Sequence, residues 1–574
     1  MWSKSENEKS VLFKLDCTNF RVIAETKNHV EISFTKTWNV ASVKDNVLPL
    51  NIDKRFIMLT GVSGFYTYAI FEHLKGWPGL HIDEARIAFK PDKDLFHYMA
   101  ISDNMQKIMP TEEDVKRGKT LDYKEAVILT NPTNPILKGQ VDDKYQYSCE
   151  NQENHVHGWI SSQPHVGFWV ITPSDEFRSG GPVKQDLTSH SGPTALAVFF
   201  SGHYASPEFR IKLHNGEPWK KVFGPIFIYL NSDSGNKPVT LWKDAKQQMM
   251  IETKKWPYDF PSSKDFPSAR QRGSITGRLL VRDMYLNKKI HPAKSAYVGL
   301  ATPGDVGSWQ EDTKGYQFWT RTDAMGYFTI ENVREGIYHL YGWVPGIIGD
   351  YKYDRMLIIK PGSKVKVGNI VYDPPRNGPT LWEIGIPDRS AAEFYVPHPN
   401  PRLVTHLFIN NTEKFRQYGL WERYAVLNPT KDVVYRIGVS DYRKHWFFAH
   451  ANRKTGKNMY KPTAWKIVFD LKNVIEKGTY TLRLALASAS LAEIQVRINN
   501  PSAKRAEFTT KQIGRDNAIA RHGIHGLYSL YSVKISGSRF VNGRNTIYLT
   551  QTRVQGPFNG VMYDYIRLEA PPPQ

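Results

Sequence analysis

Two side chains that can exchange protons near neutral pH, Lys144 and His203, lie in aromatic-rich segments of a strongly basic chain. Lys144 falls within Asp142–Tyr147 and His203 within Phe199–Tyr204, and both segments are typical of strands. A lysine and a histidine held over a carboxylate-bearing substrate can remove a proton beside the carboxylate and protonate the oxygen that leaves. We therefore take these two residues as candidates for acid–base chemistry.

The lysine can act as a base only if its amine is neutral. Its pKa must then fall from about 10.4 toward 7–8, through burial or a nearby cation. The carboxylates of Asp142 and Asp143 would raise that pKa if they lay close. For an isolated Asp-Asp-Lys triplet, a surface ion pair with these aspartates is the commoner arrangement. For an isolated histidine, a hydrogen-bonded position at a strand end is the commoner one.

Arg86 is a third candidate, because a guanidinium stays charged and can bind a carboxylate through two parallel hydrogen bonds. It lies within Asp83–Phe89. An ion pair with Glu84 or Asp83 explains the same pattern equally well.

Other motifs give weaker signals. His155 and His157 alternate near Glu150 and Glu153, so metal ligation is conceivable, although a solvated loop fits the pattern better. The tight turn at Ser179–Asp186 lacks the residues of a phosphate-binding loop. The 56 acidic residues leave a glycosidase-type carboxylate pair open.

Composition narrows the class of partner. The formal net charge is +20 over 574 residues, a field that concentrates polyanions near the surface. The basic residues are dispersed and no nucleic-acid-binding signature is present, which disfavours nucleic acid. No apolar run approaches the roughly 20 residues of a membrane span, and no secretory signal is visible at the N-terminus.

The two cysteines, Cys17 and Cys149, either pair or remain free, and the sequence leaves this open. No Cys/His spacing suggests zinc. One glycosylation triplet, at Asn410–Thr412, says little about the compartment, because such triplets often occur by chance.

Short alternating runs bounded by Gly, Pro, Asn and Asp predict an all-β fold. Leu482, Leu484 and Leu486 alternate with other residues, as do Ile494, Val496 and Ile498, so each trio should face a core. Strands are also predicted at 35–38 and 65–68. Helices are predicted at Leu241–Glu252 and at Thr111–Arg117, which begins with a pattern like a capping box.

Two proline-rich stretches predict three modules. The first, at 256–267, and the second, at 373–379, suit linkers. The divisions are therefore 1–262, with the alternation of a β-sandwich; 263–376, a fibronectin-like sandwich; and 377–574, a jelly roll. In the second module, strands are predicted at 296–302, 316–322, 326–330 and 338–344.

Several longer segments can be compared with known families: Leu50–Leu59, Gly64–Glu72, Val141–Glu150, Glu176–Asp186, Leu381–Phe394, Ala520–Tyr528 and Met562–Leu568. Together they resemble plant rhamnogalacturonan lyases, which form part of polysaccharide lyase family 4. The resemblance covers nearly the whole chain and all three modules. It implies a large catalytic β-sandwich, a fibronectin type III-like domain and a carbohydrate-binding-like jelly roll.

The resemblance implies an endolyase that cleaves the rhamnose-α-1,4-galacturonate bond of rhamnogalacturonan I, the backbone of pectin, by β-elimination. The catalytic pair of the fungal relatives matches Lys144 and His203, and their substrate-binding arginine matches Arg86. Lys144 would take the C5 proton of galacturonate, and Arg86 would neutralise its carboxylate. His203 would protonate the departing rhamnose oxygen or orient the base. No cofactor and no metal are implied.

Two departures from the family accompany the resemblance. Leu196 and Val198 occupy the positions of a Tyr-x-Tyr in the fungal relatives, so part of the sugar contact is expected to differ. Family members usually carry a secretion signal and further N-terminal strands that are not found here. The first module is therefore expected to be shortened, with an open sheet edge.

Two other functions stay open at this point. A non-catalytic pectin-binding protein, or an inactive truncated homologue, is the main alternative, and hydrolysis by paired carboxylates is the other. The resemblance predicts an acidic polysaccharide as partner, with neither nucleic acid nor a membrane. It also predicts a monomer in the extracellular space, at the cell wall.

Overall fold

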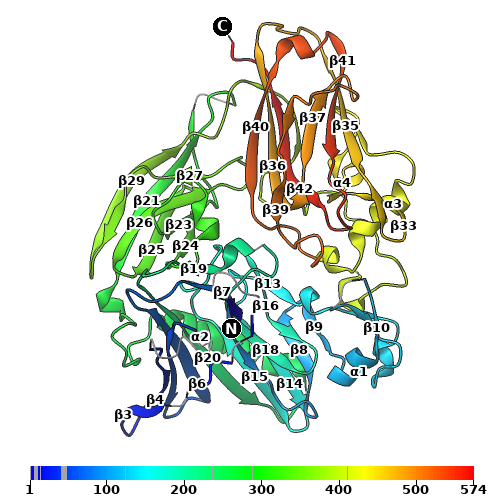
Figure 1. Cartoon of the computed structure of the whole chain (residues 1–574). Helices are drawn as coiled ribbons and strands as arrows, with labels where there is room; N and C mark the ends of the chain where they lie inside the picture. The colour runs from blue at the N-terminus through cyan, green and yellow to red at the C-terminus, as the bar shows by residue number, and fades with distance from the viewer. Residues whose placement is uncertain are drawn as a thin grey trace.

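The computed structural model describes residues 2–4, 11–12, 14–17, 19–39, 48–122, 125–205, 207–235, 237–286, 289–409 and 412–573. The chain is all-β with short helices. We call residues up to 262 module I, residues 263–376 module II and residues 377–574 module III. In Figure 1, module I runs from blue to green at the bottom, module II is green at the left, and module III is yellow to red at the upper right.

Module I is a sandwich of two main sheets. The nine-stranded sheet has the order β3 (Asn19–Glu25), β4 (His29–Lys36), β5 (Asn51–Leu59), β6 (Gly64–His73), β20 (Trp219–Ser232), β15 (His165–Ile171), β14 (Val156–Ser162), β8 (Phe96–Ser102), β9 (Met105–Ile108). The second sheet has the order β17 (Ser189–His190), β18 (Thr194–Ser201), β7 (Leu80–Phe89), β1 (Trp2–Lys4), β2 (Val11–Leu12), and β19 (Ile211–Leu213) also pairs with β7. Smaller ladders join β10 (Lys119–Thr120), β11 (Val127–Ile128) and β12 (Val141–Asp142), and β13 (Ser148–Glu150) with β16 (Gln185–Leu187).

The side chains of the large sheet alternate between two cores, as period-2 geometry requires. On β14, Trp159 packs into the core between the sheets, and Ile160 packs into the core beneath α2 (Pro238–Lys255). The helix predicted at 241–252 is thus confirmed and covers the outer face. The helix α1 (Glu112–Arg117) is confirmed as well, with Thr111 in a capping box. The strand predicted at 35–38 is β4, which ends at Lys36, and the one predicted at 65–68 lies inside β6.

Module II is a smaller sandwich around its own core. One sheet contains β22 (Ile290–Pro292), β21 (Gly273–Arg282), β25 (Tyr327–Val333) and β29 (Lys364–Tyr372). The other contains β24 (Phe318–Arg321), β23 (Tyr297–Ala301), β26 (Gly336–Trp343), β27 (Tyr351–Lys352) and β28 (Leu357–Ile359). All four strands predicted here are confirmed, with ends that differ by a few residues.

Module III packs two antiparallel-rich sheets face to face. One contains β30 (Thr380–Gly385), β42 (Gly560–Glu569), β36 (Thr479–Ala492), β39 (Ile513–Arg515), β32 (His450–Ala451) and β40 (Ser529–Ser536). The other contains β31 (Val434–Arg436), β35 (Thr463–Leu471), β41 (Gly543–Gln551), β37 (Ile494–Ile498) and β38 (Phe508–Thr509). The hairpin β33 (Arg453–Gly456)–β34 (Met459–Lys461) and the helices α3 (Arg423–Leu427) and α4 (Tyr442–His445) complete it. Both predicted trios, on β36 and β37, face the shared core.

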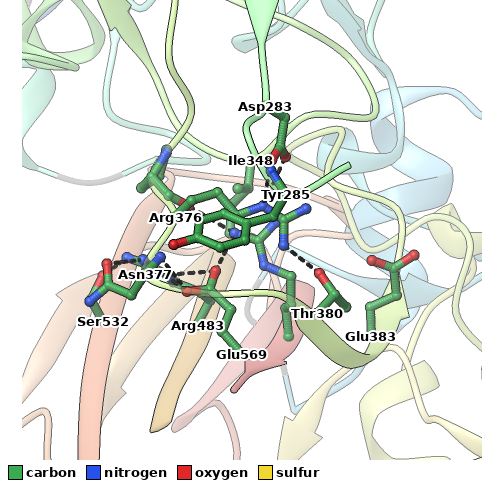
Figure 2. Close-up of polar contacts among 12 residues, drawn as sticks. Asp283, Tyr285, Ile348, Arg376, Asn377, Thr380, Glu383, Arg483, Ser532 and Glu569 are labelled. Carbon is green, nitrogen blue, oxygen red and sulfur yellow. Dashed lines mark hydrogen bonds and ion pairs between the residues drawn. The ribbon is translucent and has the colours of Figure 1, made fainter. Parts of the chain in front are cut away.

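Buried ion pairs fix the linker between modules II and III, as Figure 2 shows. Arg376 contacts Asp283 of module II at 2.8 Å and also donates to Thr380. Arg483 of module III donates to the side chain of Asn377 at 2.8 Å and contacts Glu569 at 3.2 Å. These contacts anchor Arg376 to module II and Asn377 to the core of module III, on the two sides of the boundary.

Candidate active site

Strand β7 supplies the arginine and a buried carboxylate. In the antiparallel pair with β18, Arg86 lies opposite Val198 and Glu84 lies opposite Ser201. Residues two apart on a strand share a face, and Arg86 Nη1 lies 2.8 Å from Glu84 Oε1. The ion pair with Glu84 that the sequence left open is therefore present, and it holds Arg86 beside the end of β18.

Lys144 lies in a single 3₁₀ turn, Lys144–Gln146, so the predicted strand at this position is wrong. Strand β12 ends at Asp142, because the side chain of Asp143 accepts the backbone N–H of Tyr145 at 3.0 Å and caps the turn. The aspartates do not pair with the lysine. Asp142 accepts from Tyr147 Oη at 2.5 Å, and the ion pair of Lys144 is with Glu125, at 4.0 Å.

His203 also lies in a turn rather than on a strand, because β18 ends at Ser201. Its imidazole is 13% exposed, and Nε2 lies 3.6 Å from Glu84 Oε2. The Nδ1 atom is buried and has no hydrogen-bond partner among the described residues. The ring of Tyr145, which follows Lys144, lies 5.9 Å from the imidazole between centroids. The structure thus brings Lys144, His203 and Arg86 into one site.

Module III contributes a cation that the sequence reasoning missed. Arg521 Nη1 donates to the backbone oxygen of His203 at 2.5 Å, and its guanidinium stacks over the ring of Tyr145 at 4.2 Å. The next residue, His522, contacts Asp143 at 2.9 Å, with both side chains fully buried. The only signal in the sequence was that Arg521 lies in the segment Ala520–Tyr528, which resembles the family. Nothing in that segment indicated that Arg521 lies beside His203.

Burial and positive charge set the protonation state of the site. Burial lowers the pKa of Lys144, Arg521 and Arg86 lower it further, and Glu125 opposes them. Burial also holds the pKa of His203 well below its usual value, with Arg521, Arg86 and Lys144 adding to the effect. The imidazole is therefore neutral at neutral pH. A site where two arginines and a lysine come together is suited to a substrate carboxylate.

Two further titratable groups border the site. Burial raises the pKa of Glu84, against the opposing charge of Arg86. On β17, burial lowers the pKa of His190 to about 4, and Lys144 and Arg86 contribute to that shift. No sequence pattern singles out His190, because only the pairing of β17 with β18 brings it close to the site.

The two family departures, Leu196 and Val198, are buried on β18. They pack with Tyr145, Leu187 and Tyr204 in a small apolar cluster. The Tyr204 hydroxyl donates to the backbone oxygen of Tyr145 at 2.7 Å. These aliphatic residues therefore support Tyr145 from below.

The remaining candidates lie apart from this site or carry no ligand geometry. His157 is buried between Asn154 and the backbone oxygen of Leu196, so the solvated loop expected there is wrong for this residue. Among the described residues, no group of three or more His, Cys, Asp or Glu could hold a metal ion. Cys17 and Cys149 are both free. Asn410 lies outside the described residues.

No helix in the described part of the chain has the length and apolar character needed to cross a membrane.

Comparison with known families places this site in context. The model of the rhamnogalacturonate lyase family matches residues 1–141, and those of polysaccharide lyase family 4 domains II and III match 293–367 and 380–568. A rhamnogalacturonate lyase of Dickeya dadantii is 25% identical over 559 residues, 96% of this chain and 82% of that protein. A probable rhamnogalacturonate lyase B of Aspergillus niger is 24% identical over 524 residues, 87% of this chain and 70% of that protein.

With its three modules in this order, the chain is a polysaccharide lyase of the all-β type. It belongs to the rhamnogalacturonate lyase family, polysaccharide lyase family 4. The first match includes Arg86 and ends before Lys144 and His203. A solved family 35 carbohydrate binding module from an environmental isolate is 15% identical, with 25% of this chain and 90% of that chain covered and a TM-score of 0.13.

Proposed function

We propose that this lyase is a rhamnogalacturonan endolyase that cleaves the rhamnose-α-1,4-galacturonate bond of rhamnogalacturonan I by β-elimination. The observation that carries the proposal is the meeting of Lys144, His203 and Arg86, joined by Arg521, in one partly buried site. A uronate carboxylate needs cations, and a proton beside it needs a neutral base.

In this proposal, Arg86 and Arg521 neutralise the galacturonate carboxylate, which makes the C5 proton more acidic. Lys144 takes that proton, since burial and both arginines lower its pKa toward the neutral form. The C5–H electrons form the C4–C5 double bond as the bond from C4 to the glycosidic oxygen breaks. His203 then gives a proton to the departing rhamnose oxygen. To do so it must first gain one, and the bound carboxylate promotes this by offsetting the surrounding cations.

The neutral state of His203 favours a second assignment of the same two residues. In the free protein, His203 is already unprotonated and can accept the C5 proton directly, while an ammonium on Lys144 can protonate the leaving oxygen. A galacturonate with a 4-nitrophenyl group on O4 separates the two assignments. Its leaving group, 4-nitrophenolate, departs without needing a proton from a general acid. The variant without the general acid should keep most of its activity on this substrate, and the variant without the base should lose it.

The first test is ultraviolet absorbance against time on purified rhamnogalacturonan I, with Lys144→Ala beside wild type. We expect a rise for wild type, from the unsaturated product, and a loss of about 100-fold or more for Lys144→Ala. The exposed Lys138→Ala serves as a control and should behave as wild type. A rise in both Lys144→Ala and wild type would remove Lys144 from the mechanism. No rise in folded wild type would favour the alternative, a non-catalytic pectin-binding protein.

The proposal extends to the setting of the enzyme. A pectin substrate implies an extracellular protein that acts at the cell wall. We also propose a monomer, because one chain supplies all four residues of the site from modules I and III. Light scattering after gel filtration should give a mass near 65.9 kDa, and a dimer mass would contradict this part.

A further inference from the structure

A second cavity, separate from the candidate active site, lies between modules I and II. Its volume is about 450 Å³, and two indole rings line it, Trp256 at the end of α2 and Trp319 on β24. Polar side chains of both modules line it as well, among them Gln152, His155 and Thr329. We propose that this cavity is a binding site for a neutral oligosaccharide. The proposal stands whether or not the proposed function is correct.

The two indoles are held in place by protein contacts. On β24, Phe318 packs into the core of module II, and Trp319 points to the opposite face. Its ring lies over Gly299, where a Cβ atom would fall 2.3 Å from the indole, and Nε1 donates to Gln317 at 2.8 Å. Trp256 packs edge-on against Tyr258 at 5.4 Å. Fixed aromatic rings beside polar groups offer flat apolar surfaces for the C–H faces of sugars.

The backbone around the cavity is suited to hydroxyl groups. Strands β24 and β25 contribute Thr320 and Thr329 to the lining. Among the described strands, β24 pairs only with β23 and β25 only with β21, so each is the edge of its sheet. Edge strands present backbone N–H and C=O groups without ladder partners. A sugar hydroxyl both donates and accepts, so it can bond with either group.

The charges of the cavity favour a neutral ligand over a uronate. Arg178 is 3% exposed, and its guanidinium contacts Asp175 at 2.9 Å. His155 faces the same carboxylate at 4.0 Å. Glu176 is already paired with Arg272, at 2.6 Å, and the remaining acid, Glu331, is exposed. The cations of the lining are thus neutralised, whereas Lys144, Arg86 and Arg521 all act on His203 in the candidate active site, so we expect a uronate to bind there.

The chain connects the two sites over a short distance. Asn151, in the lining, follows Lys144 by seven positions, which span at most about 25 Å. Its side chain donates to the backbone oxygens of Ser179 and Gly181 at 3.2 and 2.9 Å. A polysaccharide with both acidic and neutral sugars could therefore occupy both sites at once, the acidic part at Lys144 and the neutral part at Trp319.

The test is calorimetric titration of the full chain with cellotetraose, mannotetraose and β-1,4-galactotetraose, and with tetragalacturonate as the charged probe. We expect at least one neutral tetrasaccharide to bind and Trp319→Ala to weaken it at least tenfold. Because Trp319 also packs against protein, Thr329→Trp provides a second variant, in which an exposed position is enlarged to fill the cavity. It should abolish neutral-sugar binding.

The matched control is Trp343→Phe, which changes an indole of the same sheet that stacks on Tyr297 outside the cavity lining. It should bind as wild type does. Tetragalacturonate binding should be unchanged by Thr329→Trp, because the uronate binds elsewhere. The proposal is overturned if none of the three neutral probes binds wild type, or if Thr329→Trp leaves their affinity unchanged.

Discussion

At the scale of single residues, one imidazole takes its protonation state from neighbours that the sequence places far away. Lys144 and His203 could be found from residue type and family resemblance. Arg521 could not, because it lies 318 positions beyond His203, and no local pattern distinguishes it from the other basic residues. Its guanidinium is nevertheless the largest charge effect on the pKa of His203. Part of the chemistry of the site is therefore visible only in the folded chain.

Replacing Arg521 with glutamine should raise the pKa of His203, because a positive neighbour that disfavours the imidazolium is removed. The pKa of the base, Lys144, should rise for the same reason. The acid limb of the activity profile should then move to higher pH, and activity at neutral pH should fall about tenfold or more. Titration of the His203 ring proton by NMR, with Arg515→Gln as an exposed control, measures the shift. A titration that stays at the wild-type pH would contradict this electrostatic role.

At the scale of elements, the alternation of apolar residues predicted where strands lie better than the residues at which they end. The strands β36 and β37 follow from apolar alternation alone. The ends of β12 and β18 do not, because side-chain capping by Asp143 and the turn after Ser201 decide them. Both candidate catalytic residues lie just beyond strand ends, where side chains leave the regular ladder and can point into a pocket.

Asp143→Ala should therefore disturb the site by loosening the turn that carries Lys144, because Asp143 itself is not proposed to transfer a proton. The carboxylate caps the turn that carries Lys144 and also pairs with the buried His522. Its loss should lower the free energy of unfolding by about 3 kcal/mol and reduce activity at least about tenfold. Urea unfolding and the absorbance assay measure both, and Asp143→Asn, which can still cap, should lose less. Equal losses in the two variants would count against the capping argument.

At the scale of the whole molecule, buried ion pairs join the modules. Glu176 of module I lies 2.6 Å from Arg272 and 2.7 Å from Arg334, both of module II. Although burial opposes it, these two arginines keep the pKa of Glu176 below its ordinary value. Composition could predict three modules but not their contacts, since a charged residue in the sequence carries no sign of a buried partner.

Glu176→Gln should leave two buried guanidinium groups without their counter-charge. We expect the free energy of unfolding to fall by about 3–5 kcal/mol. Asp373→Asn is the matched control, because its pair with Arg282 is about half exposed on both sides and should change stability by less than about 1 kcal/mol. Urea denaturation followed by tryptophan fluorescence measures both variants. If Glu176→Gln and Asp373→Asn lowered the free energy of unfolding equally, burial would not explain how much the Glu176 ion pairs contribute to stability.

The response of the whole molecule to acid should follow from histidines that fold in the neutral form. Burial lowers the pKa of His450 to about 3, and that of His157 in module I also to about 3. Between pH 6.5 and 3 the unfolded chain binds protons at these sites and the folded chain does not, so acid removes stability over that window.

Each histidine should contribute a loss of about 1.4 kcal/mol per pH unit. His450→Gln removes one of the two contributions, so the stability advantage of wild type over this variant should shrink by about 2 kcal/mol between pH 6.5 and 5. Urea unfolding at a series of pH values measures the difference directly. A constant difference across that range would mean that His450 is protonated in the folded state, and that the stack of its ring on Trp465 at 4.1 Å does not exclude the charge.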